Sequence, residues 1–323
     1  HGDLRTDHIY FTTSGIQVID CIEFNDTLRV LDIISDLAFL IMDLEYHHFS
    51  ETAKTLIRRY VNQTDDLGAL PLLPFFCCYR AMVRCKVSCF RLRECGDRGA
   101  DSDMLKAAAG RYLSMAHGYA SAFSRPILWV VCGLPASGKS TIAQALAAVV
   151  DVNVIRSDVI RKELFSGSPA ASDSTAYGAG MYSALASEAT YERMFALAQE
   201  DLKKGRSVII DATFHRASRR TQALRLATSR QATPAFVECR AGEASLAARL
   251  LKRETEPSVS DARLIHLEAF KKRYQPMVRM GSEIHIPVDT ENPPADCLRH
   301  ILLTDALFVG CLQGSARKGG THV

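Results

Sequence analysis

The chain has 323 residues, which is enough for one large domain or two smaller ones. Apolar residues make up 47% and charged residues 23%, an ordinary composition for a soluble globular protein. The formal net charge of +3 is too small to indicate a partner such as long nucleic acid or an anionic membrane. No apolar run is long enough to cross a bilayer and no secretory signal is visible, so we expect a cytoplasmic protein.

Two short runs of β-forming residues open the chain and predict a hairpin around the turn Thr13-Ser14-Gly15. Asp3 precedes the first run, and Asp20 directly follows the second. Kinase-like sites use two such acids, one for the acceptor hydroxyl and one for Mg²⁺. The alternative is that both carboxylates only cap and tie loops.

The next part of the chain reads as helical. Asp32 and Asp36 lie one turn apart and should share a helix face. The stretch Leu70–Pro74 is expected to break the helical run because it holds two prolines. A further helix is predicted over 104–123, and Ser124-Arg125-Pro126 reads as a junction between domains.

The cysteines are concentrated in one place. The chain has 10 of them, and those between Cys77 and Cys95 have spacings that fit no zinc pattern, with no histidine among them. We expect reduced thiols on helices, with a metal or redox cluster as the alternative.

One motif is specific enough to indicate chemistry by itself. Residues 133–141 read G-x-x-x-x-G-K-[ST], the phosphate-binding P-loop, and the expected contacts with ATP come from Gly133, Pro135, Ala136, Ser137, Gly138, Lys139, Ser140 and Thr141. Glycines allow the tight turn that points successive N–H groups at one anion. Lys139 is expected to reach the β- and γ-phosphates and the Ser140 hydroxyl to bind Mg²⁺.

The surroundings of the motif favour a nucleotide site over a glycine-rich turn. The continuous apolar run 127–132 reads as a buried parallel strand, and a helical pattern follows the loop. From there strands and helices alternate, with further strands predicted over 152–155, 207–210, 234–239 and 283–288. This alternation predicts a parallel sheet with helices on both faces.

Two acids follow predicted strands at the edge where ligands of parallel sheets bind. Asp158, after the second strand, is expected to orient or deprotonate the attacking hydroxyl, or else only to cap the next helix. Asp211 ends the third strand and is expected to hold Mg²⁺ or to orient the nucleophile. The basic residues His215, Arg216, Arg219 and Arg220 either contact an anionic substrate or form a solvated face.

Two later segments suggest mobile covers. Arg249 and Arg253 lie one turn apart on a predicted helix, suited to the charge on a transferring phosphoryl group, or else solvated. This helix resembles the lid helix of adenylate-kinase-like and polynucleotide-kinase-like enzymes. The Gly/Ser-rich stretch 166–180 is either a substrate cover or a plain loop, and 254–261 is a polar loop that lets the lid move.

The first forty residues carry a resemblance to a known family. His1-Gly2-Asp3, the stretch 19–25 (IDCIEFN) and the stretch 29–40 (RVLDIISDLAFL) are similar to the C-terminal lobe of aminoglycoside phosphotransferases. The chain resembles bacterial proteins that fuse such a lobe to a P-loop domain of the AAA_33, zeta-toxin or polynucleotide-kinase type. The resemblance implies that Asp3 is the catalytic-loop acid and Asp20 a metal ligand, and that Asp32 and Asp36 brace the catalytic loop. Where the family has asparagine five residues after the catalytic acid, this chain has His8, and the family's ATP-holding half would lie upstream of residue 1.

These observations predict an α/β protein with an incomplete kinase-like lobe at 1–124, a P-loop domain at 125–312 and a disordered tail at 313–323. The leading hypothesis is an ATP·Mg²⁺-dependent kinase that acts on an unidentified hydroxyl-bearing small molecule or nucleotide, through Lys139, Asp158, Asp211, Arg249 and Arg253. A nucleotide-binding switch without an acceptor is the alternative. A third possibility is an aminoglycoside-type phosphotransferase that acts through Asp3.

Overall fold

The computed structural model describes residues 1–95, 99–165, 184–255, 264, 267–277 and 284–304, and these form two compact units, His1–Ser124 and Arg125–Thr304. The sequence-based predictions for 166–180, for most of 254–261 and for the tail at 313–323 lie outside the described residues. None of the helices in the described ranges is both long and apolar enough to span a bilayer.

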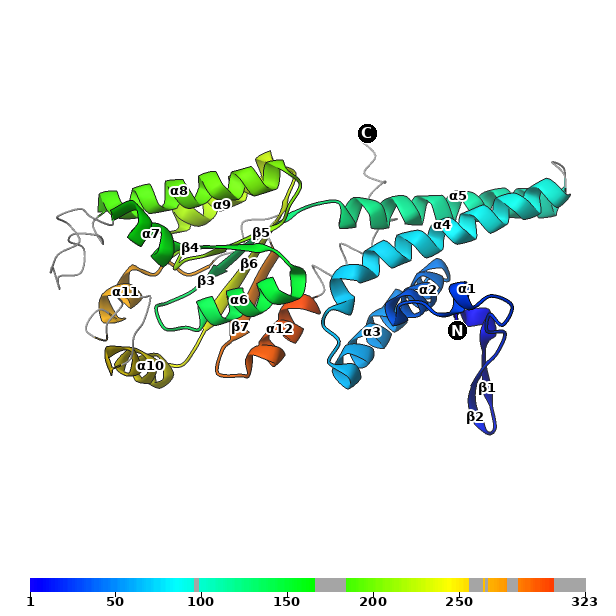
Figure 1. Ribbon diagram of the computed structural model, residues 1–323, viewed down its shortest axis with the longest axis horizontal. Coiled ribbons are helices and arrows are strands. Elements are labelled where there is room, and N and C mark those ends of the chain that lie inside the picture. Colours follow the sequence, from blue (N-terminus) through cyan, green and yellow to red (C-terminus); the bar gives the residue numbers. More distant parts are fainter. Residues whose placement is uncertain (96–98, 166–183, 256–263, 265–266, 278–283, 305–323) are drawn as a thin grey trace, which may run out of the picture. The chain divides into compact units, whose positions relative to one another are not determined.

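The first unit is a small hairpin followed by helices (Figure 1). Its elements are η1 (Thr6–His8), β1 (Ile9–Thr12), β2 (Gly15–Val18), α1 (Asp26–Arg29), α2 (Ile33–Tyr46), α3 (Ser50–Thr64), α4 (Ala69–Cys95) and α5 (Ala100–Phe123). The strands β1 and β2 pair antiparallel with Phe11 opposite Ile16, so the predicted hairpin is confirmed. Its core lies among the helices, where Phe39, Ile41, Met42, Ile57 and Leu73 are buried.

The proline-containing stretch 70–74 does not break the helical run. Helix α4 begins at Ala69 and includes both Pro71 and Pro74. The interruption lies earlier, where Asp65 takes a left-handed conformation at the end of α3. Pro71 lies in the first turn of α4, where N–H groups have no partner within the helix, whereas Pro74 lies inside the helix. The prediction of a break at Leu70–Pro74 was therefore wrong.

Asp32 and Asp36 make different contacts, although they lie one turn apart. The Asp32 side chain caps α2 by accepting a hydrogen bond from the backbone N–H of Ile34 at 3.0 Å. Asp36 points instead to the start of the chain and accepts the N–H of Gly2 at 2.9 Å. Asp36 therefore fixes the loop that carries Asp3.

The second unit is a five-stranded sheet in the order β4-β5-β3-β6-β7, and every pair is parallel. Its strands are β3 (Ile127–Cys132), β4 (Asn153–Arg156), β5 (Val208–Asp211), β6 (Thr233–Arg240) and β7 (Ile284–Asp289). Its helices are α6 (Lys139–Val150), α7 (Ser157–Phe165), α8 (Ala184–Lys203), α9 (Ala217–Ser229), α10 (Glu243–Thr255), α11 (Leu267–Arg273) and α12 (Pro294–Leu302).

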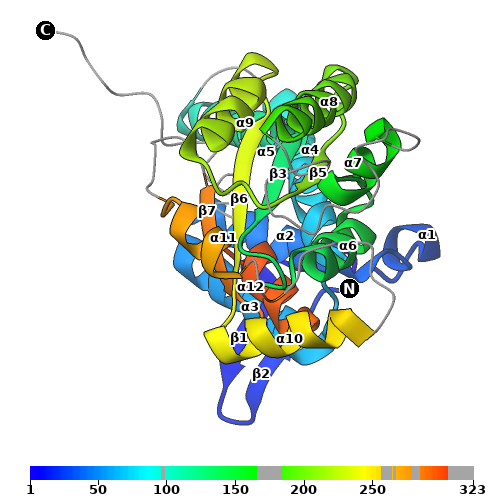
Figure 2. The ribbon, with the colours of Figure 1, turned by 90° about the vertical axis from the view of Figure 1, so that its left-hand side faces the viewer.

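Helices cover both faces of this sheet, with α8 and α9 on one side and α6 and α12 on the other (Figures 1 and 2). The two strands in the middle of the sheet are almost entirely buried: in β3 every residue from Leu128 to Cys132 is buried, and in β5 all four residues are. Continuous apolar strands are expected where both faces of a parallel sheet are covered. The α/β fold class with a parallel sheet is confirmed, and the carboxyl ends of β3, β4 and β5 meet at one edge.

Candidate active site

The P-loop follows β3 and leads into α6 at that edge. Its backbone turns through left-handed conformations at Gly133 (φ 135°), Ala136 (φ 62°) and Gly138 (φ 82°). A Cβ on Gly133 would lie 2.3 Å from the carbonyl oxygen of Cys239, so no larger residue fits there. Left-handed positions of this kind turn N–H groups toward a common anion. The first N–H groups of α6 have no acceptor within their own helix and add to such a site.

The Ser140 hydroxyl and the Asp211 carboxylate meet directly beside the loop. The hydroxyl, at the start of α6, donates to Asp211 Oδ2 at the end of β5 over 2.6 Å. Asp211 is buried, and this burial raises the pKa of its carboxyl, while Lys139 and the Ser140 hydrogen bond act in the opposite direction. Arg156, at the end of β4, brings its Nε to 3.6 Å from Asp211 Oδ2. Three elements thus meet at one carboxylate.

This pair of oxygen ligands has the chemistry that Mg²⁺ prefers. Magnesium binds hard oxygen donors, takes few protein ligands and keeps several waters together with substrate phosphates. A hydroxyl and a carboxylate in contact at the end of the phosphate-binding loop fit that requirement. Ser140 and Asp211 are therefore the residues that fit the predicted metal.

Lys139 and Asp158 lie in the same neighbourhood. The Lys139 ammonium donates to the backbone carbonyl of Leu134 at 2.6 Å, across the loop that it follows. Asp158 is in the first turn of α7, with one carboxylate oxygen 3.4 Å from Nη1 of Arg161. The charge of Asp158 contributes to the raised pKa of Asp211, as expected for two neighbouring carboxylates.

Helix α10 packs directly on the P-loop. Leu246 and Leu250 are buried in one cluster with Ala136, and Leu134 packs against them. Arg249 donates to the carbonyl oxygens of Ala136 at 3.3 Å and Thr290 at 2.7 Å. Arg249 thus lies at the loop with its guanidinium bonded to backbone oxygens, and its role in neutralising a transferring phosphoryl group stays a prediction. Arg253 is also in α10, as the pattern predicts, while its side chain lies outside the description.

Thr290 completes the loop, and sequence reasoning did not find it. Its hydroxyl lies 2.8 Å from the carbonyl of Ser137 and 2.9 Å from that of Arg240. A Cβ on Gly138 would lie 3.1 Å from the Thr290 Cβ. The signal available in the sequence was only that Thr290 follows the last strand, at the same edge of the sheet.

Of the basic residues after Asp211, Arg216 is exposed, but Arg219 and Arg220 are not part of a solvated face. Arg219 is buried against the ring of Tyr191 and paired with Glu188. Arg220 is buried as well and donates to the backbone carbonyls of Phe214, Gln275 and Pro276. These two arginines join α8, α9 and the segment after α11. Their role in this structure is to hold the fold.

His215 lies in the same region. Burial and the surrounding arginines lower the pKa of its imidazole to about 4, so it is neutral at physiological pH.

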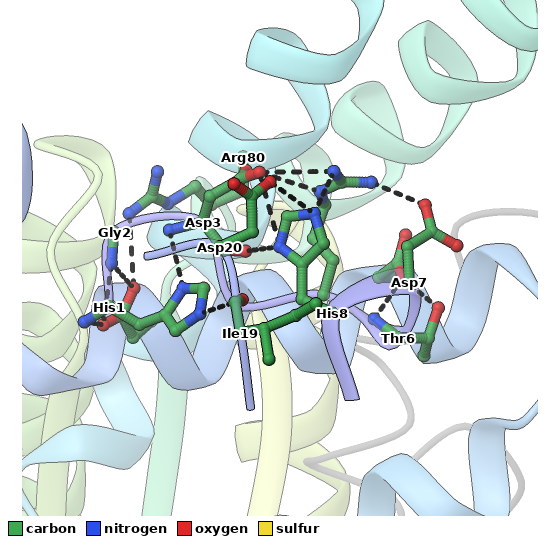
Figure 3. A network of polar contacts seen from close by, with 12 residues as sticks. His1, Gly2, Asp3, Thr6, Asp7, His8, Ile19, Asp20 and Arg80 are labelled. Carbon is green, nitrogen blue, oxygen red and sulfur yellow. Dashed lines mark hydrogen bonds and ion pairs between the residues drawn. The ribbon is translucent and has the colours of Figure 1, made fainter. Parts of the chain in front are cut away.

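The first unit contains a second cluster of polar groups, at the base of the hairpin (Figure 3). His8 lies between two carboxylates: its Nδ1 is 3.7 Å from Asp3 and its Nε2 is 3.3 Å from Asp20. Arg5 also pairs with Asp3 at 3.2 Å. Hence the two acids that the family resemblance singles out are brought together by the residue that departs from the family.

A metal at the cysteines is not favoured by the geometry. Within the described ranges, no group of three or more His, Cys, Asp or Glu side chains is arranged to hold a metal ion. This applies also to Asp3, His8 and Asp20, and the assignment of Asp20 as a metal ligand stays a prediction. The cysteines that the structure describes form no disulfides.

The parallel sheet, the glycine-turned loop after its central strand and the hydroxyl–carboxylate pair define the second unit as a P-loop domain. Residues 128–277 match the model of the AAA_33 family, described as an AAA domain. This match confirms the AAA_33 part of the resemblance.

Among curated proteins, the chain is similar to the uncharacterized proteins Rv2004c of Mycobacterium tuberculosis and Mb2027c of Mycobacterium bovis. Each is 33% identical over 258 residues, which cover 78% of this chain and 49% of the relative. The chain therefore spans about half the length of these curated relatives. Among solved structures, the chain is similar to a gluconokinase from Sinorhizobium meliloti 1021. The matched region covers 57% of this chain and 92% of the gluconokinase chain, with 18% identity and a TM-score of 0.40.

Proposed function

We propose that the second unit binds ATP together with Mg²⁺ and transfers the γ-phosphoryl group to a hydroxyl of a small molecule or nucleotide. The observation that carries this proposal is the contact between Ser140 and Asp211 beside a P-loop. It joins the start of the phosphate-binding helix to the end of the neighbouring strand, at the edge of the sheet where parallel α/β proteins bind ligands.

In this proposal the loop amides and the positive end of α6 bind the phosphates, and Lys139 turns from the Leu134 carbonyl to the β- and γ-phosphates. Ser140 and Asp211 hold Mg²⁺, which when bound neutralises charge on the phosphate oxygens. Asp158 accepts the proton of the acceptor hydroxyl. The oxygen of that hydroxyl bonds to the γ-phosphorus as the bond to ADP breaks. Arg249 and Arg253 are assigned the neutralisation of the negative charge that develops in the transition state, for which Arg249 would exchange its backbone carbonyl partners for phosphate oxygens.

The test is a screen of ATP consumption with pools of nucleosides, sugars, nucleotide sugars and nucleic-acid 5′ ends as acceptors. Lys139→Ala serves as the blank. We expect one pool to raise ATP consumption in the wild-type protein and none to do so in the variant. If no pool and no fraction of a small-molecule extract raises consumption, the kinase proposal fails.

Asp158→Asn distinguishes a kinase from a nucleotide-binding switch. A kinase with this variant should bind ATP with unchanged affinity and lose about a hundredfold or more in transfer rate, the usual range for a lost general base. A switch that has no acceptor would lose nothing measurable.

A second candidate function belongs to the first unit. In this candidate Asp3 and Asp20, which both lie close to His8, form an aminoglycoside-phosphotransferase-like site at the base of the hairpin. This candidate predicts ATP consumption that depends on an aminoglycoside, persists in Lys139→Ala and is lost in Asp3→Asn. The absence of such turnover in a protein of the relatives' full length would exclude it.

A further inference from the structure

Arg156 lies at the ligand edge of the sheet and has no part in the mechanism proposed above. It is the last residue of β4 and is in register with Asp211, the last residue of β5. Residues in register on neighbouring strands point to the same side of a sheet. The Arg156 Nε accordingly lies 3.6 Å from Asp211 Oδ2, the oxygen that also accepts the Ser140 hydroxyl. Arg156 therefore faces the pair of residues that fit Mg²⁺.

The Nε of Arg156 is a donor without an acceptor. Its separation from Asp211 is that of an ion pair and is too long for a hydrogen bond. This nitrogen is buried, and it has no hydrogen-bond partner in the part of the chain that the structure describes. A buried donor of a charged group is costly to leave unpaired, and such a group in a folded protein calls for an explanation. A guanidinium has donors only, and carboxylates and phosphates match its planar fork.

Two other arginines of this unit are already engaged with oxygen atoms. Arg249 donates to the carbonyl oxygens of Ala136 and Thr290. Arg220 is buried and donates to three backbone carbonyls. Either guanidinium would have to break hydrogen bonds before it could bind a phosphate. The Nε of Arg156 has none to break.

The order of the strands indicates which phosphate Arg156 meets. The strands β4, β5 and β3 are neighbours in that order, and β3 leads into the phosphate-binding loop. Next to β3, β5 ends in Asp211, and beyond it β4 ends in Arg156, with Asp158 two residues further along the chain. Arg156 thus lies on the side of Asp211 from which the proposed acceptor base comes. In a transfer reaction the γ-phosphoryl group is the one between the metal and the acceptor.

The charges around Asp211 point to the same phosphate. Burial raises the pKa of the Asp211 carboxyl, and the positive charges of Lys139 and Arg156 oppose this effect. When Asp211 also holds Mg²⁺, three cations surround one carboxylate, and like charges so close together need further negative charge nearby. The terminal phosphate of ATP supplies that charge, and ADP lacks this group.

We propose that Arg156 binds the γ-phosphate of ATP and makes the site select ATP over ADP. This inference rests on the proposed binding of ATP·Mg²⁺ and adds to it a residue that determines nucleotide specificity. The Arg156 side chain is only 22% exposed, so it is held in place before the ligand arrives and loses little conformational freedom on binding. Its Nε and one terminal nitrogen can donate together to two phosphate oxygens.

The test is calorimetry of residues 1–323 with ADP and with the imido analogue of ATP, AMPPNP, each in Mg²⁺ and in EDTA. We expect Arg156→Ala to weaken AMPPNP binding about tenfold or more and to change ADP binding by less than about twofold, since one charge-assisted contact is lost. Arg156→Lys keeps the charge without the fork and should lose less. The matched control is Arg206→Ala, which removes an exposed arginine paired with Asp201 and should bind both nucleotides as wild type does. Urea unfolding of each variant verifies that the chain is folded.

The outcomes separate this inference from the proposal that it rests on. If the wild-type chain binds neither nucleotide, the proposed function fails and the role of Arg156 fails with it. If the wild-type chain binds both, the inference alone is overturned by unchanged AMPPNP affinity in Arg156→Ala or by equal weakening of AMPPNP and ADP. A loss that appears in Mg²⁺ but not in EDTA also overturns it, because Arg156 would then act only by positioning Asp211 for the metal.

Discussion

The Thr290 hydroxyl bonds to the carbonyl oxygen of Ser137 at 2.8 Å, although the two residues are 153 positions apart in the chain. Arg249 adds bonds from α10 to Ala136 and to Thr290 itself. The phosphate-binding loop is therefore held from outside by the loop that follows β7. Its conformation does not depend on its own glycines alone.

Thr290→Val should weaken ATP binding without unfolding the protein. Valine keeps the shape of the side chain but leaves the buried Ser137 carbonyl and the part-buried Arg240 carbonyl without this donor, at a cost of about 1–3 kcal/mol. We expect a threefold to about tenfold loss in ATP affinity by calorimetry, since part of that cost falls on loop geometry. The control is Thr228→Val, whose hydroxyl bonds only within α9 at Leu224. An affinity equal to wild type in Thr290→Val would show that the loop needs no such support.

Gly133→Ala should both destabilise the second unit and abolish ATP binding. The new Cβ would lie 2.3 Å from the Cys239 carbonyl, and the backbone φ of 135° is unfavourable for alanine. We expect a loss of about 2–4 kcal/mol in the free energy of unfolding, measured in urea.

Gly205→Ala is the matched control for that substitution. Gly205 also has a positive φ, of 70°, but a Cβ there meets nothing within 4 Å. It should cost only about 1 kcal/mol, the backbone penalty by itself. Equal losses for the two variants would contradict the clash at Cys239.

Asp211→Asn should remove the dependence of ATP affinity on magnesium. The amide keeps the size of the carboxylate and still accepts the Ser140 hydroxyl, but it carries no charge for the cation. We expect ATP to bind wild type about tenfold or more tightly with Mg²⁺ than with EDTA, and the variant to bind equally under both conditions. Asp151→Asn, at an exposed helix end, should behave as wild type. A variant that keeps its magnesium dependence would place the metal elsewhere.

Glu45→Gln should make the first unit less sensitive to pH. Burial raises the pKa of Glu45 from 4.5 to about 8, and the Tyr119 hydroxyl donates to the carboxyl. The folded state therefore binds the proton more tightly than the unfolded state does. The stability that this provides is complete below pH 4.5 and is lost as the pH rises to about 8.

The pH dependence of Glu45 shows in the difference between the free energies of unfolding of the wild type and the variant. At pH 8.5, Glu45→Gln should be more stable than wild type by about 1–3 kcal/mol, and near pH 4.5 the two should be alike. Urea unfolding at several pH values measures this, with the exposed Glu94→Gln as the control. A constant difference across the pH range would mean that Glu45 does not titrate there.

The parts of the site that could be predicted from the sequence are those whose structure is determined by a local residue pattern. The P-loop spacing sets its own turn, and the short apolar runs ending at Cys132 and Asp211 are typical of buried strands, which is what they form. Parallel strands then bring Ser140 and Asp211 to one edge, which is why a contact between residues 71 positions apart was predictable.

The parts that sequence could not predict depend on partners far along the chain. Arg219 and Arg220 look like a basic face in the sequence, but both are buried. Arg219 pairs with Glu188, and Arg220 donates to three backbone carbonyls. Thr290 has no motif, because a hydroxyl that bonds backbone oxygens requires no fixed neighbours. The prolines at 71 and 74 suggested a break, but α4 begins at Ala69, so Pro71 lies in its first turn, and the helix continues through Pro74.

The bonds from Thr290 and Arg249 to the P-loop have a thermodynamic consequence for the end of the sheet. Any ligand that seats on the loop also immobilises the segment after β7, and through Arg240 it steadies β6 as well. Ligand binding at the loop should therefore slow amide exchange along β7, the outermost strand of the sheet. By the same linkage, truncation or proteolysis at β7 should lower the affinity for the nucleotide.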